Sequence, residues 1–214
     1  MRTTSLRTHY NHIAGQNVER LAALSDGVFA VAMTLLVLDL RTPAETAVHS
    51  ESDLWKAIVL LAPRVLVYLM SFLTLGIFWG GQQTQLNYFS HSDRHLTWIH
   101  LAFLFGVSLM PFSTSLMAAF ISYRLALLLY WANIFALGVI LFAAWRYGKS
   151  SQLVKRDLSA ELADAIERRI IIARALYALG ALLCLVNTYW SLGFILLVQI
   201  NYAIAPRFNP LSRL

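Results

Sequence analysis

Charged residues are scarce in this 214-residue chain. Only 13% of the residues are Asp, Glu, Lys or Arg, about half the share of a typical soluble domain, whereas 58% are hydrophobic. A soluble fold of this size could not bury so much apolar surface, because its own surface must stay largely polar. The composition excludes a soluble globular protein, and the 13% of aromatic residues excludes an intrinsically disordered chain. What remains is an integral membrane protein with almost no extramembrane domain, which argues against an enzyme.

Cysteine and recognisable catalytic motifs are also scarce. Cys184 is the only cysteine, so the chain can form neither an intramolecular disulfide nor a cysteine-based metal site. It contains no glycine-rich phosphate loop, no His-Glu-x-x-His motif and no Gly-x-Ser-x-Gly motif. A Thr-Val-Gly-Tyr-Gly run, which forms carbonyl-lined ion filters, is absent too. We therefore expect no catalytic residues and no cofactor.

Three histidines allow a metal site to be considered. His91 and His95 are spaced i, i+4, and His100 follows. Two histidines at that spacing can bind zinc when they lie on a helix, but no third ligand falls at a recognisable spacing. We expect polar residues at a membrane edge and no metal site. A small membrane enzyme or metal-binding subunit built on these three histidines stays open as an alternative.

Six apolar segments follow a polar N-terminal stretch, and they form a single domain over residues 1–214. A spanning helix needs about 20 residues, and the first five segments reach that length. The sixth is short, but a merged helix over Ile170–Ala205 would measure about 54 Å, so we expect a break near Asn187–Gly193. The predicted spans cover about residues 18–40, 56–80, 95–118, 123–146, 165–189 and 191–206.

The distribution of basic residues predicts the orientation. The net charge is +6. If the chain has six spans and a cytoplasmic N-terminus, twelve of the 17 Lys and Arg residues fall in cytoplasmic parts. Three (Arg41, Lys56 and Arg124) fall on the other side. Arg64 and Arg174 lie inside segments. This bias is typical of membrane proteins and explains the basic charge without nucleic acid, which we do not expect as a partner. The sequence predicts an all-α membrane protein with six spans and both termini in the cytoplasm.

The first segment carries polar residues inside an apolar run. Ser25 and Asp26 lie near its cytoplasmic end, where an ionisable side chain is expected to face protein or water rather than lipid. Arg20 is a candidate counter-ion for Asp26, although it lies on another helix face. An interfacial Asp26 that stabilises the start of the helix is the alternative.

Two stripes run along the same segment. The small stripe suits close helix packing. The bulky stripe could meet lipid, or it could form an apolar constriction if several copies of this helix surrounded an axis. The small stripe consists of Ala23, Gly27, Ala30 and Thr34, and the bulky stripe of Leu24, Val28, Val31, Leu35 and Leu38.

The run Arg20-x-x-x-Leu24-Ser25-Asp26-Gly27, followed by Val-Phe-Ala-Val-Ala-Met-Thr-Leu-Leu-Val-Leu, resembles the signature of the transmembrane protein 175 family. Phe78-Trp79 and Pro111-Phe112-Ser113-Thr114 extend the resemblance into the second and third segments. The family consists of lysosomal-type potassium channels with single-repeat bacterial members of about this length. The resemblance implies a homotetramer whose first helix lines a central pore.

The resemblance also implies roles for particular residues. The pore-lining residues would be Val31, Thr34, Leu35 and Leu38. A motif network for packing and gating would lie at one depth near the cytoplasmic end, and it would comprise Arg20, Leu24, Ser25, Asp26, Trp79, Gln82 and His100. Three of these depart from the family pattern: Leu24 replaces Phe, Gln82 stands where His is frequent, and His100 where Asn is frequent.

These observations predict a potassium-permeable cation channel in the cell membrane, with passive flux through an apolar side-chain constriction. The expected partners are further copies of the chain, the lipid bilayer and permeant ions, which are potassium and, as further candidates, sodium or protons. The alternative is a proton- or ion-coupled secondary transporter that uses Asp26 as its ion site.

Overall fold

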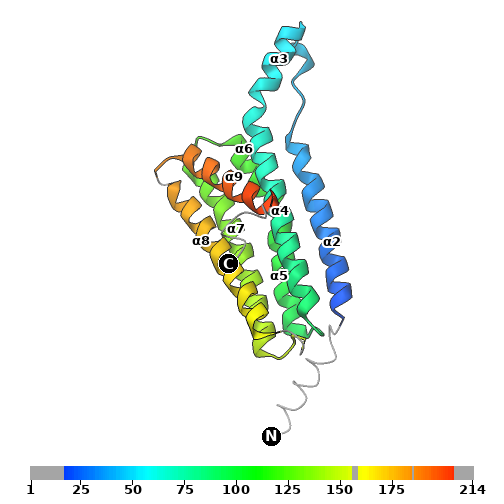
Figure 1. Ribbon diagram of the computed structural model, residues 1–214. Coiled ribbons are helices and arrows are strands. Elements are labelled where there is room, and N and C mark those ends of the chain that lie inside the picture. Colours follow the sequence, from blue (N-terminus) through cyan, green and yellow to red (C-terminus); the bar gives the residue numbers. More distant parts are fainter. Residues whose placement is uncertain (1–16, 156–158, 185, 205–214) are drawn as a thin grey trace.

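The computed structural model describes residues 17–155, 159–184 and 186–204 of the chain. Five basic residues counted in the predicted topology (Arg2, Arg7, Arg156, Arg207 and Arg213) and residues 205–206 of the sixth expected span lie outside them. The structure is a bundle of α-helices (Figure 1). Its elements are α2 (Val18–Leu35), η1 (Leu36–Asp39), η2 (Glu45–Ala47), α3 (Glu51–Leu60), α4 (Ala62–Tyr88), α5 (Arg94–Ser108), α6 (Met110–Ala119), α7 (Arg124–Ser150), α8 (Ala160–Leu183) and α9 (Thr188–Ile204).

Local sequence features fix where these helices begin. The Asn17 side chain caps α2 by accepting a hydrogen bond of 3.1 Å from the backbone N–H of Arg20. Asp93 caps α5 in the same way, with 2.7 Å to the N–H of Leu96. Pro111 lies in the first turn of α6 and has no N–H to donate, so the helix that starts as α5 breaks before it. The third expected span, 95–118, is therefore two consecutive helices.

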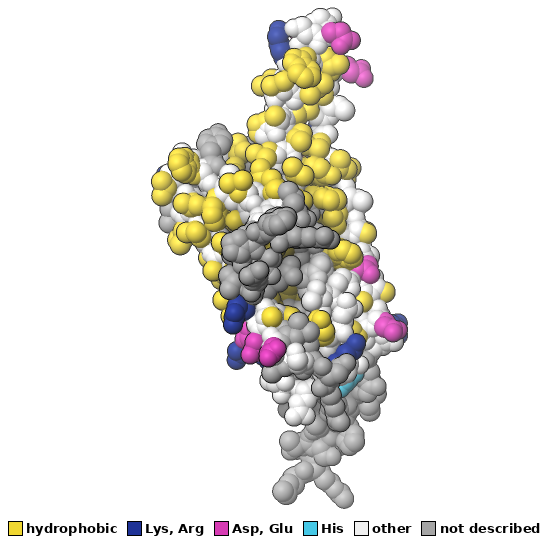
Figure 2. Space-filling model, viewed as in Figure 1, with side chains coloured by type: hydrophobic (Ala, Val, Ile, Leu, Met, Phe, Trp, Pro, Cys, Tyr) yellow, Lys and Arg dark blue, Asp and Glu magenta, His cyan; other side chains and the backbone are white. Residues whose placement is uncertain are grey.

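Among the described residues, four stretches are long and apolar enough to cross a membrane: Val18–Asp39, Ala62–Tyr88, Arg94–Ala119 and Arg124–Ser150. Figure 2 shows hydrophobic side chains over the middle of the molecule, with charged ones gathered toward its two ends. Apolar cores lie between the helices; Leu36, Met70, Tyr130 and Trp145 are among their fully buried members. The chain is thus an all-helical, multi-pass membrane protein.

The fifth and sixth expected spans fall on α8 and α9. The sequence of α8 contains six charged residues (Glu161, Asp164, Glu167, Arg168, Arg169 and Arg174), and α9 has only 17 residues. Neither is among the four apolar stretches of the described chain. α8 ends at Leu183 and α9 begins at Thr188, so the chain breaks just ahead of the expected stretch. Six spans therefore stay a prediction.

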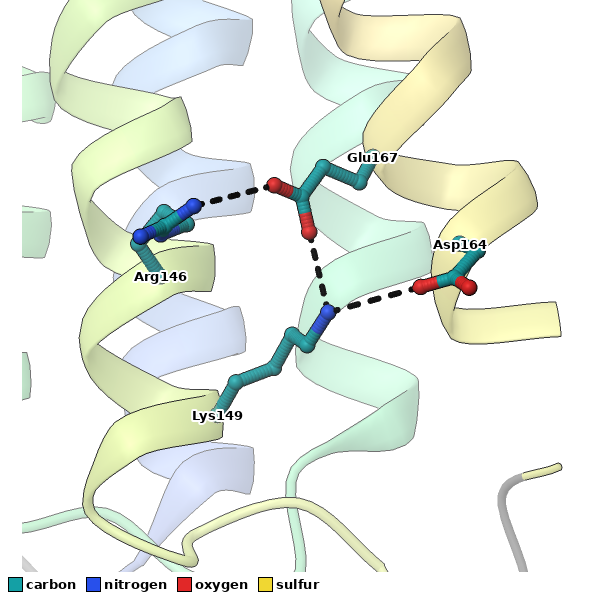
Figure 3. A network of polar contacts seen from close by, with 4 residues as sticks. All are labelled: Arg146, Lys149, Asp164 and Glu167. Carbon is teal, nitrogen blue, oxygen red and sulfur yellow. Dashed lines mark hydrogen bonds and ion pairs between the residues drawn. The ribbon is translucent and has the colours of Figure 1, made fainter. Parts of the chain in front are cut away.

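Ion pairs join α8 to α7 at the end of the bundle where α2 begins (Figure 3). Glu167 on α8 accepts from two basic residues near the end of α7: Oε2 lies 2.9 Å from Lys149 Nζ, and Oε1 lies 3.3 Å from Arg146 Nη1. Asp164 Oδ1 lies 3.7 Å from the same Lys149 Nζ. Isolated exposed ion pairs contribute little, but a carboxylate that bridges two cations holds both helices in one relative position.

We predict that a methyl group at position 148 destabilises this end of the bundle. A Cβ on Gly148 would overlap the ring of Phe89, which is buried between His100 and Trp145. Overpacking of this kind costs about 1–3 kcal/mol, so Gly148→Ala should lower the unfolding temperature in detergent by several degrees.

Gly193→Ala is the matched control, because a Cβ there meets nothing within 4 Å. The greater helix propensity of Ala should leave its unfolding temperature equal to or above that of the wild type. Equal unfolding temperatures of the two variants would show that Phe89 can move aside without cost.

Candidate functional site

Helix α2 stands at one edge of the bundle and packs on α4 and α5 (Figure 1). Its buried residues, Leu21, Ser25, Phe29 and Ala32, recur at helical spacing and form one face. The opposite face is open in the single chain. Along it lie both the small stripe and most of the bulky stripe of the sequence.

The four residues expected to line a pore all lie on this open face. Val31 is 57% exposed, Leu35 43% and Leu38 68%, and Thr34 is exposed between them. Val28, also a member of the bulky stripe, packs instead against the buried core. The residues expected to line a pore therefore lie toward the end of α2 that is farther from Asp26, whereas Leu24 is open beside it.

At the C-terminal end of the open face, the backbone changes from α-helical to 3-10 geometry. α2 stops at Leu35 and continues as the 3-10 turn η1, which contains Leu38. Sequence spacing alone treats Leu38 as part of a continuous α-helix. In a 3-10 turn residues i and i+3 eclipse each other, so Leu38 lies almost directly beyond Leu35 along the axis.

The Thr34 hydroxyl is turned back to its own helix. Its Oγ1 lies 2.9 Å from the carbonyl oxygens of both Ala30 and Val31, so its single proton is shared between two backbone acceptors. The lone pairs of this oxygen consequently face away from the backbone on the open side. Thr34 can offer an acceptor to a cation, although it has no proton left to donate.

A polar network joins the N-terminal half of α2 to the neighbouring helices. Asp26 Oδ1 accepts from Trp79 Nε1 at 2.8 Å and from Gln83 Nε2 at 2.7 Å, both on α4. These two donors are spaced i, i+4 and so share one face of α4. The expected set did not contain Gln83; its spacing from Trp79 was the available clue.

The second part of the network is fully buried. Gln82 Nε2 donates to Ser25 Oγ at 3.1 Å and faces His100 Nδ1 at 3.2 Å. Ser25 donates its own proton to the carbonyl oxygen of Leu21 at 2.8 Å, so it can only accept from Gln82. The amide therefore uses both protons, and His100 Nδ1 must be an acceptor with the ring proton on Nε2. All three side chains have zero exposure.

Two members of the expected network lie outside these contacts. Arg20 is exposed, and within the described chain no hydrogen bond or ion pair connects its guanidinium to Asp26. Leu24 is 48% exposed on the open face of α2. The structure thus brings together Ser25, Asp26, Trp79, Gln82 and His100, and leaves Arg20 and Leu24 at the surface.

The geometry does not support the alternative of a metal site built on the three histidines. His91 precedes α5, which begins at Arg94, so His91 and His95 do not share a helix. His91 Nδ1 faces the Ser90 hydroxyl at 2.8 Å, and His95 packs against the ring of Tyr147. His100 is buried in the network, away from both. The described residues contain no group of three or more His, Cys, Asp or Glu side chains that could hold a metal ion.

The structure is a membrane bundle whose edge helix α2 is held by polar contacts and leaves an apolar face open. The family described as the endosomal/lysosomal potassium channel TMEM175 matches residues 20–111. A potassium channel of Chamaesiphon minutus is 25% identical over 86% of this chain and 93% of its own length. A potassium channel of Streptomyces collinus is 35% identical over 48% of each chain.

A solved structure agrees with these relatives. The crystal structure of a TMEM175 homolog from Chamaesiphon minutus, described as a lysosomal potassium-selective channel, superposes with a TM-score of 0.77. It covers 88% of this chain and 97% of that one, at 25% identity. The chain belongs to the TMEM175 family, which confirms the resemblance carried by its first segment. It is a member of a channel family and not an enzyme.

We predict that Asp26→Ala weakens the attachment of α2 without changing which ions pass. It leaves the donors of Trp79 and Gln83 without their shared acceptor. Hydrogen bonds to a charged group contribute about 1.5–3 kcal/mol, and because Asp26 is exposed we expect a loss at or below the lower value. The unfolding temperature should fall by a few degrees, and the yield of folded protein with it.

Asp26→Asn is the conservative control, because its amide oxygen can still accept from both donors, and its unfolding temperature should stay close to that of the wild type. A stable and fully active Asp26→Ala protein with altered ion preference would contradict the assignment.

Proposed function

We propose that this chain forms a potassium-permeable cation channel in the cell membrane, with a constriction made by apolar side chains of α2. Membership of the TMEM175 family and the potassium channels among its relatives support this function. The observation that carries it is the open face of α2: Val31, Leu35 and Leu38 are exposed on a helix whose other face is fixed by buried polar contacts.

A single α2 cannot enclose a path, so the proposal requires several copies around an axis. Closed symmetric assemblies are the usual solution, and we propose a homotetramer. The small stripe favours close approach of neighbouring copies. A Cβ at Gly27 would meet nothing within 4 Å of the single chain, so space remains there for another helix. We propose that α8 and α9 supply the fifth and sixth spans, with both termini in the cytoplasm.

The constriction acts by excluding water. Four copies of Leu35 would form an apolar ring, and Leu38 would form a second ring almost directly beyond it. A narrow apolar ring resists hydration and therefore ions. Neighbouring Thr34 oxygens would offer acceptors to a partly dehydrated cation. Because leucine provides no ordered oxygens that could replace a hydration shell, discrimination between potassium and sodium should be modest.

The motif network would act on the pore through the orientation of α2. Asp26 lies nine residues before Leu35, which is about 14 Å along the helix, so it does not contact an ion at the constriction. Its contacts with α4, together with the buried contacts of Ser25, fix the direction in which the open face points. We propose that gating proceeds by a change in these contacts.

The assembly can be tested directly. We expect a mass of four chains for the purified protein in mild detergent and in lipid nanodiscs, measured by native mass spectrometry. A strictly monomeric mass in both environments would rule out the pore formed by α2.

We predict that Leu35→Ala raises potassium flux from proteoliposomes and weakens the preference for potassium over sodium, because the smaller side chain widens the ring. Leu35→Asn should also raise flux, because the amide hydrates the ring. Each lowering of the barrier by about 1.4 kcal/mol is a tenfold increase in rate, and we expect at least this increase from both variants.

Leu129 on α7 provides the matched control, because it is the same residue type at nearly the same exposure (47% against 43%) on a different helix. Leu129→Ala and Leu129→Asn should retain wild-type flux. Wild-type flux in both Leu35 variants would place this residue against lipid. Saturable uptake driven by a proton gradient, in place of passive flux, would favour the transporter that uses Asp26.

A further inference from the structure

The family resemblance assigns Leu24 to the motif network, but the structure places its side chain on the open face of α2. Leu24 is 48% exposed, close to Val31 at 57% and Leu35 at 43%. Among the described residues it belongs to neither apolar core, whereas Val28, also of the bulky stripe, packs against one of them. In its surroundings Leu24 therefore matches the expected pore-lining residues and not the members of the network.

The helical spacing gives Leu24 the same direction as these residues. α2 is one continuous α-helix from Val18 to Leu35. At 3.6 residues per turn, Val31 and Leu35 each lie within about 20° of Leu24 around the helix axis, and about 10.5 Å and about 16.5 Å farther along it. An orientation of α2 that directs Leu35 toward a central axis consequently directs Leu24 toward the same axis.

A buried contact beside Leu24 holds it in this direction. Ser25, the next residue, has zero exposure and accepts from Gln82 Nε2 on α4 at 3.1 Å. Consecutive side chains of an α-helix point about 100° apart, so a Ser25 that faces α4 turns Leu24 away from the buried face. Leu35 lies ten residues from this contact, so the network fixes the direction of Leu24 more directly than that of Leu35.

A glycine separates Leu24 from the other bulky residues of the open face. Gly27 is exposed, and a Cβ there would meet nothing within 4 Å of the chain. Val28, the next member of the bulky stripe, packs toward the core. The bulky side chains of the open face thus form two levels: Leu24 near the start of α2, and Val31 with Leu35 and Leu38 beyond the glycine.

We propose that Leu24 lines the pore and forms a separate apolar level at its cytoplasmic entrance, a role that rests on the proposed assembly of α2 around an axis. Four copies of Leu24 would surround the path before an ion from the cytoplasm reaches Val31. Leucine offers no oxygen that could replace a hydration shell, so a cation passes this level together with its water. A charge attached at position 24 would consequently act on each passing cation.

The sign of such a charge provides the test. Leu24→Cys is made in the Leu35→Asn protein, and potassium current across planar bilayers is recorded before and after labelling from both sides. One methanethiosulfonate label carries a trimethylammonium group and the other a sulfonate group. Labelling follows folding, so each preparation serves as its own reference, and mass spectrometry measures how much of the introduced thiol has reacted.

The cationic label should lower the current at least about fivefold, because a unit charge a few ångström from a cation in water opposes it by roughly this factor. The anionic label should leave the current nearly unchanged or raise it, because a negative charge attracts a passing cation. A reducing agent should restore the initial current. An equal decrease with both labels would point to disturbed helix packing and overturn the proposal. A thiol that does not react, or that reacts without a change in current, would place Leu24 against lipid and overturn it too.

Ile171→Cys in the same Leu35→Asn protein is the matched control. Ile171 is 50% exposed on α8 and lies four residues after Glu167, which is ion-paired at the end of the bundle where α2 begins. Its labelling should not change the current. The Leu35→Asn protein without a new thiol should not respond either, because its only cysteine, Cys184, is buried.

The Leu35→Asn background separates this proposal from the pore on which it rests. A higher current in Leu35→Asn than in the wild type supports the pore along α2. If Leu24→Cys then fails to respond to the sign of the label, only the role of Leu24 is lost. If Leu35→Asn itself carries no more current than the wild type, the proposed constriction fails, and the role of Leu24 fails with it.

Discussion

The buried face of α4 carries four polar side chains, and each hydrogen-bonds to another helix of the bundle. Ser71 bonds to Tyr130 on α7, and Gln82 bonds to Ser25 on α2 and faces His100 on α5. Thr74 and Gln85 complete the set through Gln199 on α9 and the carbonyl oxygen of Leu141 on α7. Helix packing in a bilayer gains little from the hydrophobic effect, because lipid is as apolar as the helices, so such polar contacts specify which helices meet. The arrangement of α2, α5, α7 and α9 around α4 depends on this face.

The polar contacts with α4 also explain why one face of α2 is buried and the other is open. Its inner face is held by Ser25 and by apolar packing around Phe29, which leaves the outer face without partners in the single chain. A helix attached only by apolar contacts could rotate at little cost. The buried amide of Gln82, bound at both of its protons, allows one orientation, and this orientation places Leu35 on the open side.

The sequence predicted the family because the first segment keeps Arg20, Ser25 and Asp26 at the spacing of the signature. It predicted much less of the polar packing, because only Trp79 and Gln82 were singled out on α4. The recurrence of Ser71, Thr74, Gln82 and Gln85 at helical spacing in an otherwise apolar helix was a readable pattern. Their partners could not be read, because they lie on helices up to 125 positions away, as Gln199 does from Thr74.

Other differences between expectation and structure have local causes. The third span is divided because proline lacks the N–H that would continue the helix across Leu109. Arg20 lies too far round the helix from Asp26 to pair with it, whereas Gln83 reaches that carboxylate from α4. The 3-10 geometry of η1 has no sequence signature in a run of leucine and valine.

The distance between the network and the open apolar face limits what the network can do. Ser25 and Leu35 are ten residues apart, about 15 Å along α2, so a change at Ser25 reaches Leu35 only by moving the helix as a body. A rotation of α2 would break the bond from Gln82 Nε2 to Ser25 Oγ before Leu35 had turned far. Intermediate orientations of α2 are disfavoured, because each would leave buried polar groups unpaired. In the pore proposed along α2, a helix with this constraint suits a gate that is either open or closed.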